Sequence, residues 1–187
     1  MKARTVTLLG ILAAVALILG YLEQLVALSS VPGVKLGLSN TVLLYALYLL
    51  DAKRAWLLMA LKVLLSGLLF SGAFAMLYGL FGGIFSLFAM CAVRRIPGVG
   101  VIGVSVCGAV AHNLGQLLIA CFVAKTSAVL TLLPVLLVAG ALAGVVTGAA
   151  AKAVFHVLKP SLPGAAQPGP DADQPNQEES DTTEVSK

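Results

Sequence analysis

The sequence predicts an all-α, polytopic membrane protein built as a bundle of six transmembrane helices. Its 187 residues are 59% hydrophobic and only 11% charged, and the mean hydropathy of +1.01 lies far outside the range of soluble globular domains. Long apolar segments follow one another as far as residue 160, separated by short polar or charged interruptions. Lys and Arg gather in alternate interruptions, as they do in the cytoplasmic loops of membrane proteins.

Charge and composition divide the chain into two parts. Residues 1–160, the predicted transmembrane domain, carry 11 Lys and Arg against Glu23 and Asp51, a net charge of +9. Residues 161–187 are rich in Pro, Gly and polar side chains and carry six acids and Lys187, a net charge of −5, so we expect a disordered, acidic cytoplasmic tail. Because the bases lie in short loops rather than on a soluble face, the expected partner is the lipid bilayer and not nucleic acid.

Turn residues or charges bound each predicted helix, and a full span needs about 20 apolar residues. The breaks are a Val-Pro-Gly turn at 31–33, an Asp-Ala-Lys-Arg turn at 51–54, a Ser-Gly pair at 71–72, an Arg-Arg-Ile-Pro-Gly turn at 94–98 and an Ala-Lys-Thr-Ser turn at 124–127. They leave predicted helices at 5–28, 36–50, 55–71, 73–93, 100–124 and 128–156.

The positive-inside rule tests this count independently. With the N-terminus inside, only Lys35 and Lys125 lie on the outer side, and Lys62 lies within a span. Both termini are therefore expected in the cytoplasm, with the chain crossing the cell membrane repeatedly. The eight bases of the cytoplasmic side are Lys2, Arg4, Lys53, Arg54, Arg94, Arg95, Lys152 and Lys159.

Residues 1–29 also fit a second interpretation, a cleaved signal peptide. Lys2 and Arg4 precede an apolar core, and Ala27-Leu28-Ser29 resembles a cleavage site. The apolar stretch is long for a signal peptide, and Glu23 lies in its second half. A retained first helix is the favoured interpretation.

Motifs for catalysis, cofactors and metals give no candidates. The three cysteines, Cys91, Cys107 and Cys121, fall inside predicted spans without a Cys-x-x-Cys spacing, so we expect apolar fillers rather than metal ligands. The chain has no phosphate-binding lysine loop and no Ser-His-Asp set. We expect no catalytic residues, no metal and no bound cofactor, and energy for any transport must come from a partner or a gradient.

A polar trio interrupts the fifth predicted helix. His112, Asn113 and Gln116 are spaced by three and four residues, so they project to one side of that helix. Because an unsatisfied polar group costs several kcal/mol in lipid, this side must face the bundle interior or a watery cavity. An interhelical hydrogen-bond clamp and a binding site both fit the trio alone.

Two ionisable residues lie within predicted spans, where such groups are rare and usually functional. Glu23 lies near the outer end of the first helix, and Lys62 lies near the middle of the third. Lys62 has three possible roles: pairing with Glu23, pairing with a neighbouring helix, or reaching the interface along a tilted span. Glu23 either binds a ligand or makes a structural contact.

The start of the second helix adds a third polar element. This helix is too short to cross the bilayer, so a partly re-entrant connection from the first helix is expected. Ser39 or Asn40 is the expected cap, and free backbone N–H groups beside Lys35 would favour an anion or a carbonyl. Together with Glu23 and the polar trio, these residues predict a pocket that opens outward.

Small residues spaced by four predict close helix packing. On the first helix, the Gly10/Ala14 and Ala16/Gly20 pairs serve either internal packing or a separate membrane subunit. Two further ridges are expected to pack internally: Ala75, Gly79 and Gly83 on the fourth helix, and Gly140, Gly144 and Gly148 on the sixth.

Two motifs, PGVKLGLSN at 32–40 and GAVAHNLGQ at 108–116, carry a resemblance to a known family, together with the Gly82-Gly83 pair, Met90 and Leu133-Pro134. The sequence resembles the Gx transporter family, also labelled heptaprenyl diphosphate synthase component I. That family is similar to the substrate-binding S components of energy-coupling factor transporters, six-helix proteins driven by a coupling membrane subunit and an ATPase pair. The resemblance implies roles for Lys35, Asn40, His112, Asn113 and Gln116. Lys62 replaces an expected arginine, which loses a bidentate contact.

Three functions remain open at this point. The first is capture of a small vitamin- or cofactor-like solute for uptake, and the polar groups suit a carboxylate, a phosphate, a flavin-like ring or a nucleobase. The second is a non-catalytic membrane component of heptaprenyl diphosphate synthase, since Asp51 is the only aspartate before the tail and cannot form the Mg²⁺-binding aspartate cluster of such enzymes. The third is a structural subunit of a membrane redox or lipid-modifying complex.

Overall fold

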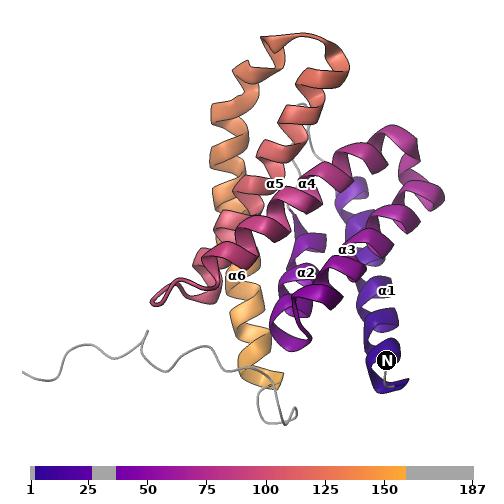
Figure 1. The fold of residues 1–187 in the computed structure, drawn as a ribbon, viewed down its shortest axis with the longest axis vertical. Coiled ribbons are helices and arrows are strands. Elements are labelled where there is room, and N and C mark those ends of the chain that lie inside the picture. Colours follow the sequence, from indigo (N-terminus) through magenta and orange to yellow (C-terminus); the bar gives the residue numbers. More distant parts are fainter. Residues whose placement is uncertain (1–2, 27–36, 159–187) are drawn as a thin grey trace, which may run out of the picture.

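The computed structural model describes residues 3–26 and 37–158, and this part of the chain consists of helices joined by short turns, without strands (Figure 1). The predicted re-entrant connection and the acidic tail lie outside the described residues. The elements are α1 (Ala3–Val26), α2 (Leu38–Leu49), α3 (Ala52–Ser66), the π-helical segment η1 (Gly67–Ser71), α4 (Gly72–Val93), α5 (Val101–Ala124), the 3₁₀ segment η2 (Ser127–Leu132) and α6 (Leu133–Leu158).

Helices α3 and α4 form a hairpin that reverses at η1. Gly72 adopts a φ of 76°, a left-handed conformation that favours glycine, directly after the π-helical turn. Beyond the reversal the two helices pack side by side. A Cβ on Gly79 would lie 3.7 Å from Val63, and one on Gly83 would lie 2.8 Å from Met59. The Ser-Gly pair at 71–72 therefore lies at a true reversal of the chain, and helical segments precede and follow it directly.

Four stretches within the described residues are long and apolar enough to cross a membrane: Thr5–Glu23, Ala52–Val93, Val101–Ala124 and Ser127–Phe155. The second of these contains the α3–α4 hairpin, and α2 is shorter than a span. Large apolar side chains point outward along the long helices. Ile18 on α1 is 59% exposed and Leu142 on α6 is 65% exposed, the outer surface expected of a protein that contacts lipid. The number of crossings stays a prediction.

The short helix α2 lies in the centre of the bundle. Leu43, Leu44 and Leu47 are each 1% exposed, and Ala46 is fully buried. A helix of 12 residues is about 18 Å long, so α2 occupies the core without reaching both faces of a bilayer. Helix α1 packs against it, burying Ala16 completely.

Helices α5 and α6 lie side by side along one side of the molecule, away from α1 and α3 (Figure 1). Glycines set their separation. A Cβ on Gly144 would lie 2.5 Å from the Cα of Val106, and one on Gly148 would lie 2.9 Å from the Cα of Ile102. The expectation that the glycines of the sixth helix pack internally is confirmed. We call this contact the α5/α6 seam.

The two basic turns between helices meet at one end of the bundle. Arg94, at the end of α4, donates a hydrogen bond to the carbonyl of Leu47 in the last turn of α2, and its guanidinium lies 4.7 Å from the ring centroid of Tyr48. Asp51 caps α3 by accepting from the backbone N–H of Arg54 at 2.8 Å. The turns at 51–54 and 94–95 therefore face the same side, as the charge pattern requires.

Candidate functional site

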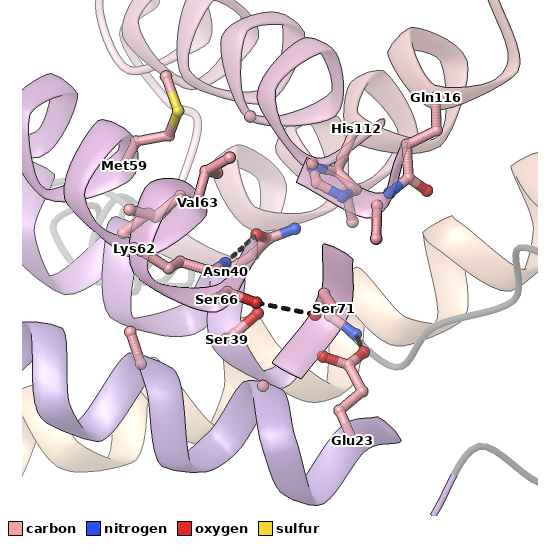
Figure 2. A pocket seen from close by; sticks show the side chains of 18 of the residues that line it. Glu23, Ser39, Asn40, Met59, Lys62, Val63, Ser66, Ser71, His112 and Gln116 are labelled. Carbon is pink, nitrogen blue, oxygen red and sulfur yellow. Dashed lines mark hydrogen bonds between the residues drawn. The ribbon is translucent and has the colours of Figure 1, made fainter. Parts of the chain in front are cut away.

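A cavity of about 180 Å³ lies inside the bundle, and all six helices contribute to its wall. The first turn of α2 and the last turns of α3 line it, so it lies toward the end of the bundle opposite the basic turns. Lys35 lies outside the described residues. The other six predicted site residues all line this cavity: Glu23, Asn40, Lys62, His112, Asn113 and Gln116. Figure 2 labels all of these except Asn113.

Glu23 lines the cavity on the side of α1. Its side chain is only 6% exposed, and its Oε1 accepts a hydrogen bond from the backbone N–H of Gly37, directly before α2. This contact joins the end of α1 to the beginning of α2. A carboxylate offers about four lone-pair sites, so one backbone donor leaves room for further donors from the cavity.

The beginning of α2 differs from the expectation. Neither Ser39 nor Asn40 caps the helix: the N-cap is Gly37, with a φ of 71° and no side-chain hydrogen bond. The predicted cap was wrong because a left-handed glycine starts the helix by turning the backbone itself. The Asn40 side chain is thus available to the cavity, where its Oδ1 accepts from Lys62 Nζ at 3.2 Å.

His112 and Gln116 occupy the opposite wall, against α4 (Figure 2). A Cβ on Gly82 would lie 2.7 Å from the His112 ring and 3.0 Å from Cγ of Gln116. The absence of a side chain at Gly82 therefore makes the space in which the imidazole and the amide lie. Gln116 is 8% exposed, so its amide is withdrawn from the outer surface.

Asn113 is placed differently from its neighbours. Its Nδ2 donates to the carbonyl of Leu136 on α6 at 2.8 Å, and it is the atom that a Cβ on Gly140 would meet at 2.7 Å. Further along the seam, Ser105 Oγ lies 3.0 Å from Thr147 Oγ1. The polar trio is therefore divided: Asn113 holds α5 to α6, as the clamp interpretation expects, while His112 and Gln116 face α4 and the cavity.

Two serines belong to the cavity wall although sequence reasoning missed them. Ser66 and Ser71 flank the π-helical segment, and their Oγ atoms lie 3.1 Å apart (Figure 2). π-Helical turns occur frequently at functional sites. The available signal is Ser71, the serine of the Ser-Gly pair at 71–72, which on sequence alone indicates only a helix break.

The remaining wall is largely apolar. Met59, Met76 and Val63 line one side, next to the small residues Ala75 and Gly79 of α4. Met side chains fill irregular spaces and adapt to different shapes. The site thus combines an acid, a base and neutral hydrogen-bonding groups with an apolar surface.

Comparison with known families gives one result: residues 12–154 match the family described as heptaprenyl diphosphate synthase component I. The chain belongs to this family. Comparison with curated proteins and with solved structures gave no match.

The family match covers the complete cavity, because the lining residues run from Ala16 to Ala143. It also covers the second and third stretches of membrane-spanning length completely, the fourth up to residue 154, and the first from residue 12. This member of the heptaprenyl diphosphate synthase component I family is therefore a membrane protein whose polar cavity lies within the family region.

Proposed function

We propose that this chain is an integral membrane, solute-binding subunit for the uptake of a small, vitamin- or cofactor-like molecule. The observation that carries the proposal is the cavity within the bundle that is lined by Glu23, Lys62, Asn40, His112 and Gln116. Work would come from a coupling membrane subunit and an ATPase pair, as in the S components that the sequence resembles. The chain itself would capture the solute.

The cavity leaves room for a ligand, which a purely structural role of its polar groups does not require. An interhelical hydrogen bond such as Lys62–Asn40 can stabilise a bundle by itself, and this role needs no empty space beside the bond. Here the polar groups border a space of about 180 Å³ instead of filling it. In a membrane interior such a space must be filled by water or by a polar ligand, because its polar groups lose hydration otherwise.

Position within the bundle supports capture from outside the cell. The basic turns define the proposed cytoplasmic end, where Arg94 contacts Leu47 of α2. The cavity surrounds the opposite end of the same helix, at Gly37 and Asn40. We therefore propose a cavity in the outer half of the cell membrane and chain termini in the cytoplasm.

The family description supports an alternative, a membrane component of heptaprenyl diphosphate synthase. Pockets for drug-sized ligands usually measure about 300–1,000 Å³, so this cavity of about 180 Å³ is small for a prenyl chain and for a large cofactor alike. Asp51 is the only aspartate among the described residues, and it caps α3 and pairs with Arg54. Under this alternative the chain is a non-catalytic component that retains a soluble prenyltransferase at the membrane, or a structural subunit of another membrane complex.

Native mass spectrometry of the detergent-purified chain tests the proposal. Gentle release should yield a small molecule from the wild-type protein and none from His112→Ala. The matched control is Ser105→Ala, which changes a polar residue of the same helix that bonds Thr147 and does not line the cavity. A folded wild type that carries nothing after exposure to a mixture of vitamins and cofactors contradicts the proposal. Copurification with a soluble prenyltransferase would then favour the synthase component.

A further inference from the structure

The charged residues of the cavity carry an inference about the class of solute, which rests on the proposed function. Among the described lining residues, Glu23 is the only carboxylic acid, Lys62 is the only lysine or arginine, and His112 is a third titratable side chain. Glu23 and Lys62 come from different helices, α1 and α3, and enter the cavity from different sides (Figure 2). We infer that the cavity takes a small, dipolar solute with no net charge, with a cationic or N–H-donating group toward Glu23 and an anionic or accepting group toward Lys62.

Each charged residue already shows which kind of partner it takes. Glu23 accepts from the backbone N–H of Gly37, and further donors from a ligand would complete its coordination. Lys62 donates to the Asn40 amide oxygen at 3.2 Å, and an ammonium group has three donors. A ligand carboxylate or carbonyl near Lys62 would also accept from the Asn40 amide nitrogen.

Charge balance decides against a strongly anionic solute. Attraction and repulsion are stronger in the low dielectric of a bundle interior than in water. A phosphate or diphosphate would bring negative charge beside Glu23, whose carboxylate is 6% exposed. A dipolar solute adds an opposite charge beside each of Glu23 and Lys62 and brings no net charge of its own into the cavity, which avoids an uncompensated buried charge.

The neutral part of the wall limits the size and polarity of the solute. Met59, Met76 and Val63 give the cavity apolar lining, together with the small residues Gly79 and Ala75. Ser66, Ser71 and Gln116 add neutral hydrogen-bonding groups. A small solute with an apolar body between its two polar groups fits this lining and the volume of about 180 Å³.

A matched probe series tests the inference. The probes are para-aminomethylbenzoate, which carries both charges, its methyl ester, which keeps only the cation, and para-methylbenzoate, which keeps only the anion. We expect the first to bind at least tenfold more tightly than either of the others, by calorimetry on the purified full chain. Glu23→Gln should remove the preference for the ammonium group, and Lys62→Met the preference for the carboxylate. Lys152→Met, an exposed lysine on α6, is the control and should change neither preference.

Identifying the molecule released from the wild-type protein separates this inference from the proposed function. A released solute that carries a donor and an acceptor group and no net charge supports both. A released phosphorylated or otherwise net-anionic solute, or equal binding of para-methylbenzoate and para-aminomethylbenzoate, overturns the inference and leaves the proposed function standing. A folded protein that releases nothing and binds no probe contradicts the proposed function itself.

Discussion

The α5/α6 seam and the cavity both contain polar residues that bond between helices, but they differ in the space beside those residues. At the seam, polar side chains bond directly across helices whose backbones touch, as Ser105 and Thr147 do at 3.0 Å. Around the cavity, Glu23 and Lys62 border an open space. Both groups of residues look alike in the sequence, as isolated polar letters in apolar helices. A polar residue where two helix backbones approach closely therefore has a structural role, whereas a polar residue beside an open space is a candidate ligand contact.

The largest expected effect is a loss of stability when the α5/α6 seam is disrupted. Gly144→Ala places a Cβ 2.5 Å from the Cα of Val106, a backbone atom that cannot move away without separating the helices. We expect a loss of about 1–3 kcal/mol of stability, the usual cost of overpacking, measured by thermal unfolding in detergent. The control is Gly10→Ala, where nothing lies within 4 Å of the added methyl group. Equal melting temperatures for the two variants would show that the seam is not close-packed.

The next prediction concerns Gly82, a glycine that packs against the cavity residue His112 and not in the seam. Gly82→Ala would press on the His112 ring at 2.7 Å, and the side chain must shift to make room. We expect solute affinity to fall about tenfold, equivalent to about 1.4 kcal/mol, with a smaller change in melting temperature than Gly144→Ala causes. Unchanged affinity, measured by calorimetry with the released solute, would show that His112 is not part of the binding site.

Asn113 and Gln116 sharpen the comparison because they lie three residues apart on one helix. Asn113→Ala removes the hydrogen bond to Leu136 and should lower stability by about 1 kcal/mol. Gln116→Met keeps the side-chain length and should lower solute affinity with little loss of stability. If both variants behave alike in unfolding and in binding, the division of the polar trio is wrong.

The smallest effect concerns the second seam contact. Ser105→Ala removes the hydrogen bond to Thr147 Oγ1, and interhelical bonds in membrane bundles contribute about 0.6 kcal/mol on average. Thr147 keeps its bond to the carbonyl of Ala143, so no buried hydroxyl is left unsatisfied. Thermal unfolding should show a slight decrease in stability, and solute affinity should not change.

The helices were predictable because apolar length and turn residues are local properties. The predicted ends of the fifth helix, 100–124, differ by one residue from those of α5, and the sixth helix begins later because Ser127–Leu132 forms a 3₁₀ turn. The gathering of six predicted residues around one cavity followed from the depth of each within its span. Whether these residues bind a solute stays a prediction.

Other features of the site depend on contacts between helices, which the sequence does not display. The role of Asn113 as a clamp depends on the position of Leu136, 23 residues away. The cap at Gly37 was missed because a side-chain cap was the expected signal, whereas the backbone of a left-handed glycine starts α2. Ser66 and Ser71 were missed because they meet only once the chain reverses at η1.

The central claim is that the cavity binds a solute while the seam holds the bundle together. Its most direct test is the melting temperature of the wild type and of Gln116→Met, each with and without the solute released from the wild type. A ligand that binds only the folded state raises its stability. We predict equal melting temperatures without solute, and an increase on adding solute for the wild type alone. Equal increases in both proteins, or an unliganded Gln116→Met that melts well below the wild type, would contradict the claim.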